Sequence, residues 1–225
     1  MKITVFNGSP KGINSNTHVI VSAFLQGAAE AGASTDNVFL IEKRIQHCAG
    51  CFSCWFKTPG KCVWQDDMSG LLELYKASDI VCFATPVYLW NMTACLKNFL
   101  DRLIPIKSPH VVKTGGSFDM ENGIKMPGVV IIANAGFPGE HNFNTLREVM
   151  KTAEPMLEIY RNCGMLLKMR HEGIQAKVQA YLGFVRQAGN AIARGVPLPD
   201  DVKKGLEQVL LPEDTYIRVI SGQAR

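Results

Sequence analysis

Small and hydroxylic residues fill a segment that could bind an anion. Residues 8–17 have the sequence Gly-Ser-Pro-Lys-Gly-Ile-Asn-Ser-Asn-Thr and lie between a predicted strand and a predicted helix. Backbone N–H groups and hydroxyls in such a loop can converge on a phosphate, which the positive N-terminal end of a helix also attracts. The composition leaves open an alternative in which Ser15, Asn16 or Thr17 only caps the helix. The loop has neither the P-loop pattern nor G-x-G-x-x-G, which argues against ATP and a classical dinucleotide.

A second loop carries aromatic side chains directly after the third predicted strand. Residues 85–91 have the sequence Thr-Pro-Val-Tyr-Leu-Trp-Asn, in which Pro86 restricts the turn. Tyr88 and Trp90 supply surface on which a planar ring could lie, and backbone groups could bond the edge of that ring. The loop therefore indicates a ring-binding site, with a buried aromatic turn as the alternative.

Four of the seven cysteines lie within one short segment. Cys48, Cys51 and Cys54 form two C-x-x-C steps, and Cys62 follows after seven residues. Closely spaced thiolates can ligate a 4Fe-4S cluster, but these cysteines could also be structural or reactive thiols, a redox disulfide or a zinc site. Zinc is the least supported, because structural zinc sites favour two separated ligand pairs. We expect the other three to be small core residues: Cys82, Cys95 and Cys163.

Apolar segments alternate with segments of helical periodicity along the chain. The predicted strands are Ile3–Phe6, Asn37–Ile41, Ile80–Ala84, Val129–Ala133 and a short one near Met165–Met169. The predicted helices begin near Asn16, Met68, Leu96, Leu146 and Ile174, and Pro155 is expected to kink or restart the fourth. Apolar strands separated by helices predict a parallel sheet covered on both faces, and hence a three-layer α/β fold. Ligands bind beyond the carboxyl ends of such strands, where the strand order reverses, which places both loops at one site.

The composition is that of an ordinary globular protein. The chain has 225 residues, of which 47% are hydrophobic and 20% charged, and its formal charge is +4. The basic residues are scattered, so we expect no nucleic-acid partner. No apolar run approaches the roughly 18 residues of a membrane span, and the N-terminus does not resemble a signal peptide. We therefore expect no membrane partner and a cytoplasmic location, in which seven cysteines argue against a disulfide framework.

Three separated motifs resemble the flavodoxin-like NAD(P)H-dependent FMN reductase family. They are residues 8–11 with 15–17, residues 85–88 after Asp79 and a strand, and the helix sequence Leu96–Arg102, and the resemblance spans about residues 1 to 165. It implies a flavodoxin-like three-layer sandwich with a five-stranded parallel sheet, FMN as cofactor and NAD(P)H as co-substrate. The residues implied for the FMN phosphate are Ser9, Lys11, Ser15, Asn16 and Thr17. Those implied for the isoalloxazine are Pro86, Val87, Tyr88, Leu89, Trp90 and Asn91, with Asn134 and Gly136 of a third loop at its border.

The resemblance also bears on the cysteine segment. Iron-sulfur flavoproteins, a sister group, carry a compact four-cysteine motif in the corresponding loop, whereas the gap before Cys62 is longer in this chain. Similar loops occur in family members that bind FMN alone. We therefore expect FMN alone and no metal ligands. The alternative is a 4Fe-4S cluster on Cys48, Cys51, Cys54 and Cys62.

The expected function is that of an oxidoreductase that accepts hydride from NAD(P)H and reduces a quinone, a nitro or azo compound, or a flavin. This hydride transfer requires no acid or base from the protein, so no catalytic residue is predicted. An electron carrier and a ligand-binding module are competing hypotheses, and the charge of +4 does not favour the carrier, since flavodoxin-type carriers tend to be acidic. We expect residues 1–195 to form the FMN-binding domain. Residues 196–225 are expected to extend it and to pack on a partner subunit in a homodimer or homotetramer.

Overall fold

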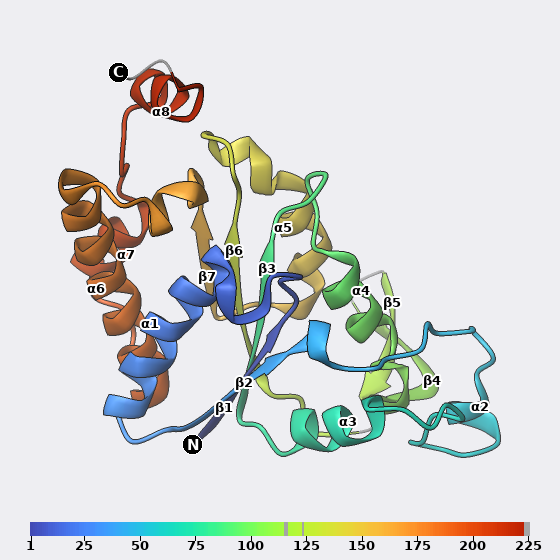
Figure 1. Ribbon diagram of the computed structural model, residues 1–225. Helices are drawn as coiled ribbons and strands as arrows, with labels where there is room; N and C mark the ends of the chain where they lie inside the picture. Colours follow the sequence, from blue (N-terminus) through green and yellow to red (C-terminus); the bar gives the residue numbers. More distant parts are fainter. Residues whose placement is uncertain (115–116, 123, 223–225) are drawn as a thin grey trace.

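A central sheet of five parallel strands organises the chain (Figure 1). The computed structural model describes residues 1–114, 117–122 and 124–222. The strands of the sheet are β1 (Lys2–Asn7), β2 (Ser34–Phe39), β3 (Ile80–Pro86), β6 (Gly128–Asn134) and β7 (Leu157–Arg161). They lie in the order β2-β1-β3-β6-β7, and the inner strands β1, β3 and β6 are almost completely buried because both of their faces are apolar. The predicted five-stranded parallel sheet is confirmed.

Helices cover both faces of this sheet and make it the middle of three layers. Their bounds are α1 (Asn16–Glu30), α2 (Ser53–Phe56), α3 (Met68–Lys76), α4 (Ala94–Asp101), α5 (Asn144–Met150), α6 (Glu172–Arg194), α7 (Asp200–Glu207) and α8 (Glu213–Ile220). Short 3-10 turns lie at η1 (Gly12–Asn14), η2 (Leu40–Glu42), η3 (Ile104–Ile106), η4 (Glu140–Phe143), η5 (Lys151–Ala153) and η6 (Gly164–Lys168). The core under one face includes α1, α6 and α7, and the core under the other includes α3, α4 and α5. In the described part of the chain, no helix is long and apolar enough to cross a membrane.

Two glycines allow α1 and α6 to pack closely. A Cβ atom on Gly27 would lie 1.7 Å from the backbone oxygen of Arg186, and one on Gly189 would lie 2.0 Å from that of Phe24. Any larger residue at either position would therefore push the helices apart. The contact fixes α1, which begins at the predicted phosphate loop.

The last strand differs from the prediction. The strand predicted near Met165–Met169 is wrong, because the fifth strand is β7 and that segment forms the turn η6. The expected kink or restart of the helix at Pro155 is also wrong. The chain leaves the helical conformation at Glu154, whose φ is 46°, and Pro155 has no N–H with which to continue the hydrogen bonds of the preceding helix. The second strand, β2, begins at Ser34 and not at the predicted Asn37. The prediction missed this start because β2 lies at the sheet edge, where half-exposed residues give a weak hydrophobic pattern.

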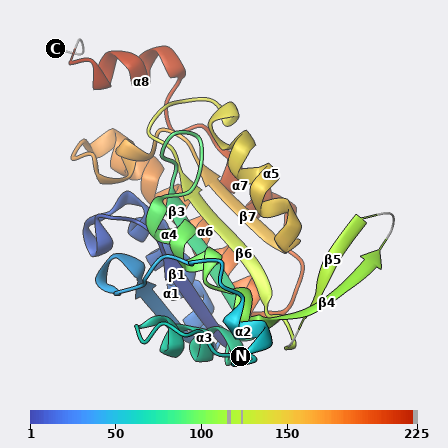
Figure 2. The ribbon, with the colours of Figure 1, turned by 90° about the vertical axis from the view of Figure 1, so that its right-hand side faces the viewer.

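A hairpin that the sequence did not predict follows α4. It consists of β4 (Lys107–Thr114) and β5 (Ser117–Asn122), which pair antiparallel as a separate two-stranded sheet. Figure 2 shows it projecting from the body of the molecule. The hairpin lengthens the connection between α4 and β6 and leaves the order of the parallel sheet unchanged.

The predicted C-terminal extension contains two helices of different character. In α7, Val202 and Leu206 are buried in the core against α6 and β7. In α8, which stands off from the body in Figure 1, Tyr216 is buried while Ile217 is half exposed. The domain boundary at residue 195 and the place of the extension at a subunit interface stay predictions.

Candidate functional site

Hydrogen bonds join the three predicted loops at the carboxyl edge of the sheet. The Gly8 N–H donates to the backbone oxygen of Ala84 at 2.8 Å, and the Thr93 hydroxyl donates to the oxygen of Gly8 at 2.6 Å. The Val87 N–H donates to the oxygen of Asn134 at 2.8 Å. Because β1, β3 and β6 are neighbours, the loops that follow them meet where the strand order reverses. The structure thus brings together the three loops that were predicted from the sequence.

Two of the hydroxyls predicted to bind phosphate are engaged within the protein. Ser15 is the N-cap of α1, and its hydroxyl donates to the oxygen of Gly12 at 2.7 Å and accepts from the His18 N–H at 2.9 Å. The Thr17 hydroxyl donates to Oδ1 of Asn134 at 2.6 Å. Both side chains are buried. They shape the loop, and the helix-cap alternative describes Ser15.

Other polar groups in and beside this loop have no hydrogen-bond partner in the described part of the chain. Ser9 is buried, and its hydroxyl makes no hydrogen bond with any described residue. In Asn7, Oδ1 accepts from the Ser9 N–H at 3.1 Å, while Nδ2 is a buried donor with no partner among the residues that the structure describes. The backbone N–H groups of Asn16 and Thr17, in the first turn of α1, donate to no acceptor in the described residues, since the first N–H groups of a helix have no partner within it. Together with the exposed Lys11, these donors are the groups that a phosphate requires.

A second cation reaches this loop from a distant part of the sequence. Lys168 in η6 donates from Nζ to the oxygen of Asn14 at 2.8 Å, across 154 residues. Its charge also acts on His18, whose pKa is lowered by burial and then by Lys168. Sequence reasoning named Lys11 alone, because no local pattern connects Lys168 to the loop. Asn7 was missed as well, since the end of a strand carries no sign of a free amide.

The aromatic loop ends in a tight turn with unusual backbone angles. Tyr88 and Asn91 exchange two backbone hydrogen bonds, at 2.9 and 3.1 Å, around Leu89 and Trp90. These two residues have φ angles of 47° and 60°, a left-handed conformation that suits glycine or asparagine. For any other residue type this conformation costs a free energy of order 1–2 kcal/mol per residue. Leu89 is 86% exposed and Trp90 is 55% exposed. The turn is therefore not the buried aromatic turn of the alternative, and it offers a surface on which a planar ring can lie.

The base of the aromatic loop and Asn134, at the start of the third loop, are buried, whereas Gly136 is exposed. Pro86 is the last residue of β3, and the half-buried Val87 follows it. Asn134, the last residue of β6, is 6% exposed. The backbone oxygen of Gly136 accepts a hydrogen bond from the hydroxyl of Tyr216 in α8. This contact ties the C-terminal helix to the candidate site, and no short sequence pattern predicts it.

The four clustered cysteines line one cavity of about 300 Å³. Cys48 and Cys51 are exposed, Cys62 is half-buried and Cys54 is buried, all as free thiols. Burial, followed by the charge of Cys62, raises the pKa of Cys54, whereas hydrogen bonding to Ser53 lowers the pKa of Cys51. Within the described residues, no group of three His, Cys, Asp or Glu side chains is arranged to hold a metal ion. The thiols surround one space without forming a closed site for a single ion.

A buried ion pair fixes both ends of the cysteine segment. Arg102, just after α4, donates to the two carboxylate oxygens of Asp66 at 2.8 and 3.1 Å, and both side chains are 1% exposed. Arg102 also donates to the oxygen of Gln46 at 2.6 Å, and Asp66 accepts from the N–H groups of Gln46 and Met68. Burial alone would raise the pKa of Asp66, but these hydrogen bonds outweigh it and lower the pKa. The pair thus holds the residues on either side of the cysteines.

Comparison with known proteins finds one matching family model. Residues 1–119, more than half of the chain, match the model of a family described as NADPH-dependent FMN reductase. The chain belongs to this family. The region that matches the FMN reductase model contains the predicted phosphate loop, the aromatic loop and the cysteine segment. The match confirms the resemblance seen in the sequence.

Among curated proteins, this FMN reductase family member is similar to iron-sulfur flavoproteins. The iron-sulfur flavoprotein of Archaeoglobus fulgidus is 36% identical over 129 residues, which cover 56% of this chain and 57% of the relative. That of Methanosarcina thermophila is 36% identical over 107 residues, which cover 48% of this chain and 54% of the relative. The chain spans about half the length of the curated relatives it matches.

Solved structures of related reductases share the fold of this family member. The NAD(P)H:quinone oxidoreductase from Methanothermobacter marburgensis superimposes with a TM-score of 0.61 at 16% identity, covering 85% of this chain and 96% of that one. The FMN-dependent NADH-azoreductase from Bacillus anthracis, solved in complex with FMN, gives a TM-score of 0.62 at 14% identity, covering 85% and 99%. At such identities the likeness concerns the fold, which is the flavodoxin-like arrangement expected from the sequence.

Proposed function

We propose that this protein binds FMN at the joined loops and uses it to pass electrons from NAD(P)H to a small-molecule acceptor. The observation that carries the proposal is the set of unpartnered donors around Ser9 and the start of α1, placed beside the exposed turn at Leu89 and Trp90. The donors suit a phosphate and the turn suits a planar heterocycle. The acceptor classes that we expect are quinones, nitro and azo compounds, and flavins.

The residues of this chain would bind, orient and shield the cofactor. Bound FMN would supply the hydride-accepting and electron-donating chemistry. Ser9, Lys11 and the N–H groups of Asn16 and Thr17 would hold its phosphate, while Ser15 keeps the loop in shape. The aromatic turn would cover one side of the ring and exclude water. In this proposal no residue of the protein acts as a catalytic acid or base.

Titration with two flavins and an assay of turnover test the proposal. FMN should bind at least tenfold more tightly than riboflavin, because only FMN carries the phosphate that the free donors recognise. The loaded protein should oxidise NADH or NADPH with menadione as acceptor. Folded protein that takes up no FMN would overturn the site, and protein that holds FMN without turnover of either nucleotide would overturn the enzymatic role.

A second candidate function is electron transfer through a 4Fe-4S cluster. It is favoured by the four cysteines that line one cavity and by the similarity to iron-sulfur flavoproteins. Anaerobic reconstitution with iron and sulfide should then incorporate about four irons per chain, since one cluster takes four thiolate ligands. Cys54→Ser should lower the iron content, and Cys82→Ser, in the buried β3, serves as the control. Equal iron content in both variants would count against the cluster.

We also propose that the protein assembles as a homodimer or homotetramer. Apolar side chains are exposed around the candidate site on the loops and on α8, namely Leu89, Trp90, Phe137 and Ile217. Covering them with a second copy would bury this surface. Sedimentation equilibrium measures the mass directly, and a monomer at micromolar concentration would refute the proposal.

A further inference from the structure

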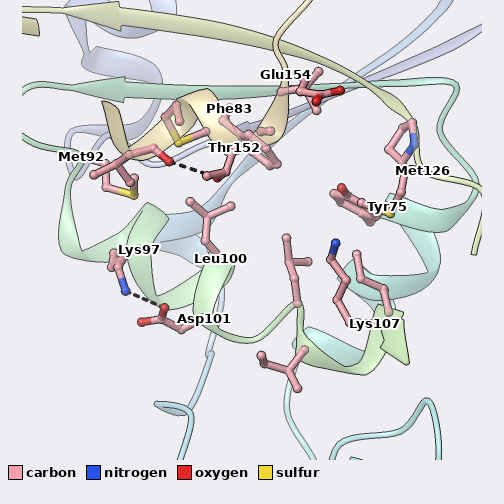
Figure 3. A pocket seen from close by; sticks show the side chains of 18 residues that line it. Tyr75, Phe83, Met92, Lys97, Leu100, Asp101, Lys107, Met126, Thr152 and Glu154 are labelled. Atoms are coloured by element: carbon pink, nitrogen blue, oxygen red, sulfur yellow. Dashed lines mark hydrogen bonds and ion pairs between the residues drawn. The ribbon is translucent and has the colours of Figure 1, made fainter. Parts of the chain in front are cut away.

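A separate cavity of about 580 Å³ lies on the face of the sheet covered by α3, α4 and α5 (Figure 3). Its lining comes from these helices, from β3 and β6, and from the segment around η3. None of the residues proposed to bind FMN contributes to this lining. The cavity has the size of sites that hold small organic molecules, which are usually lined by apolar groups with a few polar ones that orient the ligand.

Apolar side chains form most of the walls. They include Phe83, Leu100, Ile106, Met126, Val129 and Met150. Several of these are buried in the core, so the cavity floor is the core itself. Such a surface favours a hydrocarbon chain or an apolar ring over a polar ligand.

Two polar groups inside the cavity have no partner among the described residues. Tyr75 is 2% exposed, yet its hydroxyl makes no hydrogen bond with a described residue. Lys107, at the start of β4, is half-buried and likewise forms no ion pair or side-chain hydrogen bond with a described residue. Figure 3 shows the Tyr75 hydroxyl and the Lys107 ammonium group both pointing into the cavity. Burial raises the pKa of Tyr75 to about 12, so the hydroxyl remains a donor at neutral pH.

The other charged groups of the lining do not compensate Lys107. Lys97 and Asp101 form an ion pair with each other at 2.6 Å. Glu154 lies in the lining beyond the turn η5, and no ion pair joins it to Lys107. An uncompensated ammonium group and a phenolic donor in an apolar cavity together favour an anion that carries an apolar body.

We propose that this cavity binds an apolar monocarboxylate. The carboxylate oxygens would accept hydrogen bonds from the Tyr75 hydroxyl and the Lys107 ammonium group, and the hydrocarbon part would lie among Phe83, Leu100 and Val129. The site is independent of the FMN-binding loops, so its ligand and the flavin can be bound at the same time.

Isothermal titration with octanoate, octanol and octylamine tests the proposal on the full chain. Octanoate should bind with one site per chain, and octanol, which lacks the charge, should bind about tenfold more weakly. Tyr75→Phe and Lys107→Met should each weaken octanoate binding by about tenfold while leaving octanol binding unchanged. Lys97→Met is the matched control, because that lysine also lines the cavity but is already paired with Asp101. Flavin content and circular dichroism should be the same in all variants.

Three results would overturn the proposal. The first is equal binding of octanoate, octanol and octylamine, which would show an apolar cavity without selection for an anion. The second is equal loss of octanoate binding in Lys107→Met and in Lys97→Met. The third is an absence of octanoate binding together with a lower sedimentation mass for Leu100→Lys, which would identify the cavity as an interface between copies of the chain.

Discussion

Removing the charge of Asp66 should destabilise the protein far more than removing a charge from the surface. Asp66 and Arg102 are each 1% exposed and share two hydrogen bonds, at 2.8 and 3.1 Å. In Asp66→Asn the arginine remains buried without an opposite charge. Breaking a buried pair in this way costs about 3–5 kcal/mol, because the remaining charge has lost its water as well as its partner.

The matched control lies on α4, the helix that directly precedes Arg102. Lys97 and Asp101 pair at 2.6 Å, but their side chains are 55% and 47% exposed. Lys97→Met should therefore cost only about 0.3–0.5 kcal/mol. Combining Asp66→Asn with Arg102→Met should recover part of the loss, because the double variant leaves no unpaired charge in the interior.

Urea unfolding measures these free energies, and thiol labelling locates the effect. Trp55 lies within the cysteine segment and donates to the oxygen of Ile104 at 3.2 Å, so its fluorescence reports on the attachment of this segment. The buried Cys54 should react faster with a thiol reagent in Asp66→Asn than in Lys97→Met. The reasoning is refuted if the two variants lose the same free energy and Cys54 reacts at the same rate in both.

Four further outcomes follow from the structure. The hydrogen bonds that lower the pKa of Asp66 in the folded state add stability above its unfolded pKa of about 3.9, and acid titration should show this stability being lost as the pH falls through the lower folded value. Lys168→Met should weaken FMN binding about two- to fivefold and leave riboflavin binding unchanged, as measured by flavin fluorescence. Thr17→Val should lower the free energy of unfolding by about 1–3 kcal/mol, because Oδ1 of Asn134 loses its donor. Gly8→Ala should lower the free energy of unfolding by a similar amount, about 1–3 kcal/mol, since the new Cβ would lie 2.6 Å from the Cβ of Leu96. For Thr17→Val or Gly8→Ala, a thermal melt unchanged from that of the parent protein would contradict the prediction.

The parallel sheet was predictable because its signal is local and strong. The inner strands are apolar throughout, and helical periodicity separates them. The rule that ligands bind where the strand order reverses then placed the loops after β1 and β3 together. The short β7 was less predictable, because a proline at position 155 is compatible with a kinked helix, whereas the left-handed conformation of Glu154 that ends the helix leaves no sign in the sequence. The hairpin β4-β5 lies outside the sheet and follows none of these patterns.

The sequence predicted which loops form the candidate site, but not which hydrogen bonds each side chain makes there. Sequence composition could not tell that Ser15 caps the helix while Ser9 stays free, because both are serines in one loop. It could not reveal Lys168 or Tyr216 either, since each reaches the site from an element far along the chain. Such long-range contacts depend on how α8 and η6 pack, and a single sequence does not encode that packing in any short pattern.

At the turn of Leu89 and Trp90, a change that would raise stability would also remove exposed apolar surface. A protein engineer seeking heat resistance would replace these residues with Asn-Gly, the pair best suited to two successive positive φ angles. That exchange would remove the conformational strain of the turn and would also remove the exposed apolar side chains of Leu89 and Trp90. Because the same two side chains provide the exposed apolar face beside the candidate site, substitutions intended to raise heat resistance are better placed elsewhere in the fold.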